Sequence, residues 1–147
     1  MKRVFRLFVS IAVVFIATQY IAYAQCKTFA KNVCKPILDP FIHDGNYNAA
    51  ILTEGEEAEL YKTFYSGQTY RISICGSEAL PKVQFKVIDS DNNVLYDNKD
   101  KGFSPVWDFK TEASQQLKIH IKIPASGKNQ EEINSGCVAI MFGFKDE

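Results

Sequence analysis

The stretch Leu117-Lys118-Ile119-His120-Ile121-Lys122-Ile123 alternates branched apolar side chains with polar ones and contains no break. Successive side chains of a β-strand point to opposite faces of its sheet, so this pattern predicts a strand with one buried and one hydrated face. Antiparallel sheets typically show such alternation. We therefore expect His120 to point outward together with Lys118 and Lys122.

The same period of two residues recurs along most of the chain. The clear stretches are Tyr70–Ile74, Val83–Val87 and Val138–Phe144, and the weaker ones are Ala49–Thr53, Ala58–Phe64, Val94–Tyr96 and Val106–Phe109. Turn-forming residues separate them, for example Ser66-Gly67 and the run Asp89–Asn93. About eight short strands without intervening helices predict an all-β fold, an antiparallel β-sandwich resembling a jelly roll.

The N-terminus has the three parts of a secretion signal. Lys2, Arg3 and Arg6 form a positive region, and Leu7–Ala22 is mostly apolar. The sequence Ala22-Tyr23-Ala24 then places small residues where signal peptidase requires them, so cleavage after Ala24 is expected. A retained anchor is the alternative, but the apolar stretch is short and interrupted for a membrane span. We expect a secreted or periplasmic protein, with residues 25–147 forming one β-sandwich domain without a membrane span.

The charge of the mature chain excludes one class of partner. Three of the 17 basic residues lie in the leader, which holds no acid, so 14 basic and 17 acidic residues remain and the formal charge is −3. Nucleic-acid binders need a basic surface, so we do not expect one here.

Four cysteines, Cys26, Cys34, Cys75 and Cys137, follow the leader. An even number in an exported chain predicts two disulfides. A zinc site is not expected, because the sequence contains no Cys-x-x-Cys pair and neither histidine stands beside a cysteine. The sequence indicates no other metal or cofactor.

A short helix is predicted before the strands. Phe29, Val33 and Ile37 recur every four residues, and Thr28 is a plausible N-cap. We expect the helix to end near Lys35, because Pro36 cannot continue the hydrogen-bond ladder.

That helix bears on the disulfide pairing. It would hold Cys26 and Cys34 about 10 Å apart or more, whereas bridged Cα atoms lie within about 7 Å. Both bridges would then tether the helix to Cys75 and Cys137, which share the outward parity of their strands. A turn in place of the helix would allow Cys26–Cys34 and Cys75–Cys137. We favour the tethered pairing and leave its direction open.

Part of the chain resembles a known family. The stretch Leu60–Ile74, which contains Ser66-Gly67-Gln68-Thr69-Tyr70-Arg71-Ile72, is followed by Val83–Tyr96 with its Asp-rich hairpin. This arrangement resembles the bacterial pre-peptidase C-terminal domain and related jelly rolls. The resemblance implies a small exported β-sandwich that serves as a non-catalytic accessory or binding module.

Four residues are candidates for ligand binding. An exposed Trp107, with Tyr96, would offer a face for a sugar ring, but Trp107 shares its strand parity with Phe109, which favours a place in the core. Asp89 and Asp91 carry oxygen ligands suited to calcium, but the spacing of an EF-hand loop is not met, which favours a hairpin turn.

Catalysis has a single weak candidate in the pair His43-Asp44. Such a pair needs a nucleophile, and the sequence contains no Gly-x-Ser-x-Gly turn to present one. The four nearby glutamates are more simply a solvated surface that resists aggregation; they are Glu54, Glu56, Glu57 and Glu59.

Three functional hypotheses follow, and the first is favoured. The chain is an exported, non-catalytic β-sandwich that binds carbohydrate or another extracellular or envelope ligand. The alternative is a structural or protein-interaction subunit of the bacterial cell envelope. The third is a small hydrolase built around His43 and Asp44.

Overall fold

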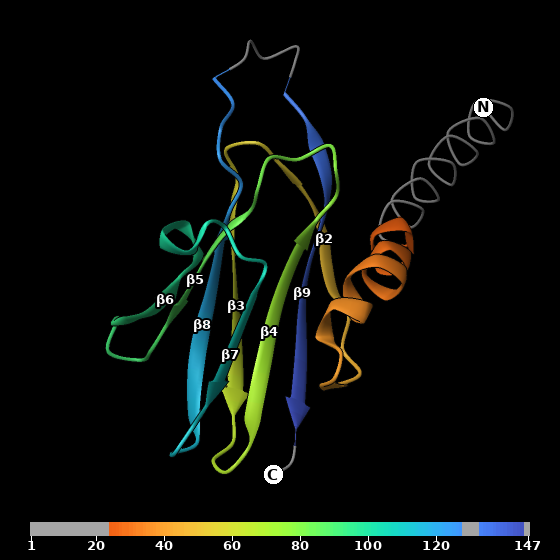
Figure 1. Ribbon diagram of the computed structural model, residues 1–147. Coiled ribbons are helices and arrows are strands. Elements are labelled where there is room, and N and C mark those ends of the chain that lie inside the picture. Colours follow the sequence, from red (N-terminus) through yellow and green to blue (C-terminus); the bar gives the residue numbers. More distant parts are fainter. Residues whose placement is uncertain (1–23, 128–132, 146–147) are drawn as a thin grey trace, which may run out of the picture.

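The computed structural model describes residues 24–127 and 133–145, which fold as two antiparallel sheets packed face to face (Figure 1). The predicted signal peptide therefore lies outside the described residues, apart from Ala24. Within the described part of the chain, no helix is long and apolar enough to cross a membrane.

The first sheet has five strands, and the long strand β9 is at its centre. Its strands are β1 (Ile42–His43), β2 (Asn48–Thr53), β4 (Thr69–Gly76), β7 (Val106–Lys110) and β9 (Ser135–Lys145). Strands β1 and β2 both pair with one edge of β9, while β4 pairs with the other edge and β7 follows β4.

The second sheet has four strands, in the order β3-β8-β5-β6. Its strands are β3 (Glu57–Phe64), β5 (Gln84–Ile88), β6 (Val94–Asp97) and β8 (Gln115–Lys122). All eight predicted stretches form strands, so the predicted β-sandwich is confirmed. The two-residue strand β1 was not predicted, because two residues are too few to show a period.

Alternating side chains build the core between the sheets. The four apolar residues of the stretch 117–123 are at most 3% exposed, and they pack with inward residues of both sheets such as Phe64, Phe85 and Phe142. His120 points to the outer face and hydrogen-bonds Glu57 on β3, as its parity predicts.

The predicted helix exists, but two details of the prediction are wrong. The helical segment runs from residue 24 through 38, with a π turn at η1 (Ala30–Cys34) and a 3-10 turn at η2 (Lys35–Leu38). Pro36 does not end the helix, because it lies in the first turn of η2, where the missing N–H is not required. Thr28 is not an N-cap, since its hydroxyl donates to the carbonyl of Ala24 one turn earlier, at 3.0 Å.

The helix packs on the outer face of the first sheet, where two disulfides hold it (Figure 1). Cys26 is bridged to Cys137, and Cys34 to Cys75, with Cα–Cα distances of 5.2 and 5.8 Å. The favoured tethered pairing is confirmed, and the pairing of Cys26 with Cys34 is excluded. Because each bridge closes a long loop, each stabilises the fold by about 4 kcal/mol in the chain-entropy account.

Arg71 of β4 fixes the end of the helix. Its guanidinium makes a bidentate ion pair with Asp108 of β7, with both N–O distances 2.7 Å. It also donates to the carbonyls of Ile37 and Asp39, at 3.3 and 2.8 Å, and lies over the ring of Phe41. The last carbonyls of a helix lack partners within the helix, so this arginine both caps the helix and ties it to the sheet.

Candidate functional site

Trp107 and Tyr96 are in contact, and both face the core. Their rings stack with centroids 5.1 Å apart, and Trp107 also stacks on Phe109 at 4.4 Å. Both are half-buried and pack against the main hydrophobic cluster, the direction that the parity of Trp107 predicts. Burial raises the pKa of the Tyr96 hydroxyl. The exposed tryptophan platform that would favour sugar binding is therefore not formed.

The carboxylate of Asp89 accepts hydrogen bonds from within its own turn. Asp89 accepts hydrogen bonds from the backbone N–H groups of Asp91 and Asn93, at 2.9 and 2.8 Å, and from the side-chain amide of Asn93 at 2.9 Å. The bonds from Asn93 are the main reason that the pKa of Asp89 is lowered. This is the geometry of a polar hairpin turn. Over residues 24–127 and 133–145, no group of three or more His, Cys, Asp or Glu side chains is arranged to hold a metal ion.

The four candidate residues do not form one site. Tyr96 and Trp107 pack half-buried against the main cluster, whereas the hydrogen bonds of Asp89 stay within its own turn. No ring contact or hydrogen bond among the described residues joins the two groups.

His43 and Asp44 are not arranged as a catalytic pair. The Nε2 atom of His43 is 3.0 Å from the carbonyl of Asn46 but 3.7 Å from the Asp44 carboxylate. Asp44 instead accepts a 2.6 Å hydrogen bond from Lys62 of β3. Burial alone would raise the pKa of Asp44, but its bonds with Lys62 and Asn46 outweigh burial and lower it. Asp44 therefore serves as a structural anion.

The four glutamates also act separately. Glu57 is bound by Lys122 and His120, and Glu59 pairs with Lys118. Glu56 accepts from the backbone of Thr53, while Glu54 accepts from Ser126 and Asn134 at the two ends of the β8–β9 connection. Each of the four carboxylates is therefore engaged by a neighbouring group of the fold.

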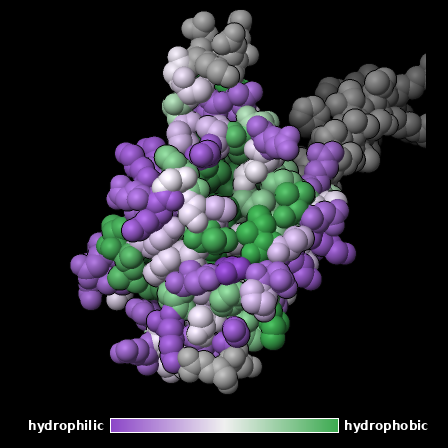
Figure 2. All heavy atoms as spheres, viewed as in Figure 1, coloured by the Kyte–Doolittle hydropathy of each residue, from purple (hydrophilic) through white to green (hydrophobic). Residues whose placement is uncertain are grey.

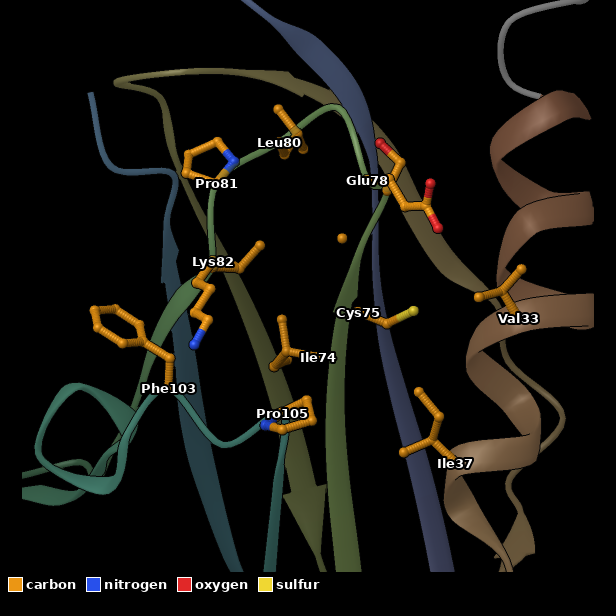
Figure 3. A pocket seen from close by; sticks show the side chains of 13 residues that line it. Val33, Ile37, Ile74, Cys75, Glu78, Leu80, Pro81, Lys82, Phe103 and Pro105 are labelled. Carbon is orange, nitrogen blue, oxygen red and sulfur yellow. The ribbon is translucent and has the colours of Figure 1, made fainter. Parts of the chain in front are cut away.

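An apolar groove of about 400 Å³ opens beside the upper part of β4 (Figure 3). It exists because β7 stops short: the carbonyl of Pro105 accepts from Ile74 at 2.8 Å, but a proline has no N–H with which to extend the pairing. Val33 and Ile37 of the helix form one wall, and Phe103 lies at the opposite side (Figure 3).

The rim of this groove carries both signs of charge. Glu78 and Lys82 flank it, and Val33 is 52% exposed (Figure 3). Apolar residues gather on this face beside the helix, and hydrophilic ones surround them (Figure 2). Such a hollow suits an apolar side chain of a partner, but it has no convergent set of polar groups that would orient a small substrate.

The hairpin between β3 and β4, residues 65–68, projects from the opposite end of the sandwich (Figure 1). Tyr65 at its start is 64% exposed, the largest value among the exposed large hydrophobic side chains of the described residues. An exposed tyrosine offers a large contact area at a small entropic cost, which is why such residues dominate many protein interfaces.

Hydrogen bonds from the side chain of Tyr70 hold the hairpin in place. The buried hydroxyl of Tyr70 accepts from the backbone N–H of Tyr65 at 3.0 Å and donates to the side-chain oxygen of Gln68 at 2.7 Å. Gly67 has a φ of +82°, which a side chain would disfavour.

The neighbouring β7–β8 connection supplies two further bonds to the hairpin. The N–H of Ser66 donates to the hydroxyl of Ser114 at 2.9 Å, and that of Gly67 donates to the carbonyl of Thr111 at 3.2 Å. The backbone of the hairpin is therefore fixed by hydrogen bonds within the protein itself.

A recess of about 200 Å³ adjoins this tip. Its lining includes Tyr65, Gln68 and Tyr70 of the hairpin region, the Lys62–Asp44 pair and Phe144. The hairpin and the recess together combine an exposed ring, an apolar wall and an ion pair. We call this combination the hairpin site.

Comparison with known proteins places the fold. No family model matches the chain, so the resemblance to the pre-peptidase C-terminal domain has no such support, and no curated protein matches either. Among solved structures, PliG of Aeromonas hydrophila, a periplasmic lysozyme inhibitor of g-type lysozyme, aligns with a TM-score of 0.51 at 13% identity. The alignment covers 72% of this chain and 89% of that one.

The fold is similar to that of PliG. PliG of Salmonella Typhimurium also aligns, at 12% identity over 68% of this chain and 86% of that chain, with a TM-score of 0.42. A de novo designed double-stranded β-helix aligns at 14% identity over 68% of this chain and 99% of that one, with a TM-score of 0.31. At these identities the comparison describes the architecture alone.

Proposed function

We propose that this chain is an exported, non-catalytic protein-binding module of the cell envelope, and that the hairpin site is its binding surface. The observation that carries this proposal is the combination of a 64% exposed Tyr65 with a backbone fixed by the buried Tyr70 hydroxyl. A projecting ring on an ordered loop binds with little loss of conformational freedom, which is the property of a good protein-interaction anchor.

A lysozyme is the first candidate partner. The support is the likeness of the fold to PliG of Aeromonas hydrophila, a periplasmic lysozyme inhibitor of g-type lysozyme. Carbohydrate is the weaker candidate, because Trp107 packs into the core and the aromatic ring left exposed at the hairpin site is a single tyrosine.

The experiment uses residues 25–147 exported to an oxidising compartment so that both disulfides form. Binding is measured by biolayer interferometry against a panel of lysozymes that includes a g-type enzyme, and inhibition by the rate of cell-wall lysis. We expect one panel member to bind, and we expect Tyr65→Ala to weaken that binding at least tenfold without changing the melting temperature.

Two further variants separate contact from rigidity. Tyr70→Phe removes the hydroxyl that orders the tip, so binding should weaken severalfold while the ring of Tyr65 is still present. Tyr61→Ala is the matched control, since Tyr61 is 57% exposed on β3 but lies outside the hairpin, and it should bind as the wild type does.

Three outcomes would each reject one part of the proposal: lysozyme as the partner, the hairpin site as the surface, or protein binding as the function. If no lysozyme binds, lysozyme is rejected as the partner. If an identified protein partner binds Tyr65→Ala and Tyr61→Ala equally well, the hairpin site is wrong. If a glycan array gives saturable binding that survives Tyr65→Ala while no envelope protein binds, the protein-binding function itself is wrong.

A further inference from the structure

The N-terminal helix carries a row of lysines on its solvent side. Lys27, Lys31 and Lys35 are all exposed and lie four residues apart. A second series with the same spacing of four residues is buried, with at most 1% of each side chain exposed. Its members are Cys26, Ala30, Cys34 and Leu38. Because positions four apart stay on one face throughout this helix, the three lysines also share one face. We call this row the lysine stripe.

The stripe differs in its pairing from five basic residues on the strands. Five basic side chains on the strands form ion pairs with carboxylates; they are Lys62, Arg71, Lys86, Lys118 and Lys122. Across residues 24–127 and 133–145, none of the three stripe ammonium groups lies within ion-pair distance of a carboxylate. The helical segment 24–38 contains no acidic residue, so its charge of +3 is not neutralised within the helix.

The scaffold holds the stripe in place. Both disulfides and Arg71 attach the adjoining, buried side of the helix to the sheet. Lys31 and Lys35 also line a recess of about 280 Å³ with Phe41 and with Asp39, which is the acidic residue on its wall. A partner would therefore meet charges on a fixed backbone beside an apolar surface, which lowers the cost of ordering on binding.

We propose that the lysine stripe docks an acidic segment of a partner protein. Lysines four residues apart on a helix rise about 6 Å along its axis. Alternate carboxylates on an extended chain are about 6.7 Å apart, so the two spacings agree within the reach of a lysine side chain. This surface is separate from the hairpin site, and the inference goes beyond the proposed function.

A protein segment fits the stripe better than a bilayer does. The exposed residues between the lysines are the polar Thr28 and Asn32 and the apolar Val33, while Cys26, Ala30, Cys34 and Leu38 are buried against the sheet. Membrane-surface helices instead insert their apolar face into the lipid. One exposed valine among three lysines is less apolar surface than insertion into lipid requires.

The test uses a fluorescent peptide of six Glu-Ser repeats as the probe, followed by anisotropy at low ionic strength. The variant Lys27→Glu/Lys31→Glu/Lys35→Glu should bind the peptide at least tenfold more weakly than the wild type. The matched control is Lys82→Glu/Lys99→Glu/Lys101→Glu, which makes the same charge change at three exposed lysines elsewhere and should alter binding less than twofold. Tyr65→Ala should bind the peptide as the wild type does, which separates this test from that of the proposed function.

Three results would overturn the inference: equal weakening by both triple variants, no binding of the peptide by the wild type, or binding to vesicles with 30% phosphatidylglycerol in preference to the peptide. The first would show an effect of net charge alone, and the last would indicate a membrane surface. If the stripe variant fails to fold, the milder Lys31→Gln/Lys35→Gln variant replaces it, with an expected loss of at least threefold.

Discussion

The two open sides of the β-sandwich are closed by different chemistry. On one side, the edge strands β6 and β7 meet through the stacked rings of Tyr96 and Trp107. On the other side, Lys62 of the edge strand β3 reaches across to Asp44, which lies between β1 and β2. The first side is closed by apolar contact and the second by an ion pair.

A series of aromatic rings joins the two sides through the core. From the apolar side inward the ring contacts run through Tyr96, Trp107, Phe109, Phe64 and Phe142. The ammonium group of Lys62 lies 4.8 Å from the centre of the Phe142 ring, at the far end of this series. The apolar side is therefore continuous with the core, whereas the ionic side, beside the hairpin site, leaves polar groups accessible.

The largest effect is expected from Trp107→Ala. This change removes the stacking on Tyr96 and Phe109 and opens one side of the core, so the free energy of unfolding should fall by about 3 kcal/mol. Urea denaturation measures it, with the exposed Tyr61→Ala as a control that should change stability by less than about 0.5 kcal/mol. A loss below about 1 kcal/mol for Trp107→Ala would mean that the stack does not close that side.

The next effect is expected on the ionic side, from Lys62→Ala. It leaves the partly buried Asp44 carboxylate without its ammonium partner, so stability should fall by about 1 to 2 kcal/mol at neutral pH. Lys86→Ala is the control, because the Lys86–Asp97 pair is longer, at 3.4 Å, and more exposed. In a double-mutant cycle, Lys62→Ala and Asp44→Asn should show a coupling of about 1 kcal/mol, and additive losses would contradict the pairing.

Sequence periodicity predicted the apolar side well and the ionic side poorly. Parity alone placed Trp107 with Phe109 in the core, because alternation fixes the face of every residue in a strand. Lys62 has inward parity on β3, but no local pattern shows that Asp44, 18 residues earlier, would meet it. His43 and Asp44 were weighed as a sequence neighbour pair, whereas the contact that matters is made across the sheets.

The same limit applies to the helix and to the hairpin site. The predicted helix between Cys26 and Cys34 favoured the tethered pairing. The continuation of that helix past Pro36 depends on the change to π and 3-10 turns, which residue propensities do not predict. The motif from Ser66 to Tyr70 was visible in the sequence, and it indicated a fold. Its role in fixing Tyr65 depends on where the Tyr70 hydroxyl points, which requires the three-dimensional structure.

Acid should weaken the ionic side selectively. The folded-state pKa of Asp44 is lowered, so its contribution is present above the ordinary aspartate value and is lost as the pH falls through the lower folded value. The stability gap between the wild type and Asp44→Asn should therefore narrow by about 1 kcal/mol between pH 6 and the acid limit of folding. Asp89, Asp97 and Glu57 also have lowered pKa values, but both proteins contain them, so their contributions to the stability difference cancel. A gap that stays constant with pH would show that Asp44 does not titrate as part of the pair.

Salt should give the smallest difference between the two sides. Raising sodium chloride from 0.1 to 1 M shortens the Debye length from about 10 to about 3 Å, yet a pair in direct contact and partly shielded from water is screened only weakly. The stability loss caused by Lys62→Ala should shrink by a few tenths of a kcal/mol, while the loss caused by Trp107→Ala should stay constant, because ring stacking involves no net charge. Comparing each variant with the wild type at the same salt concentration removes the general effect of salt on apolar burial. If both losses changed equally, the distinction between an ionic and an apolar side would fail, since the two closures would then respond to the solvent in the same way.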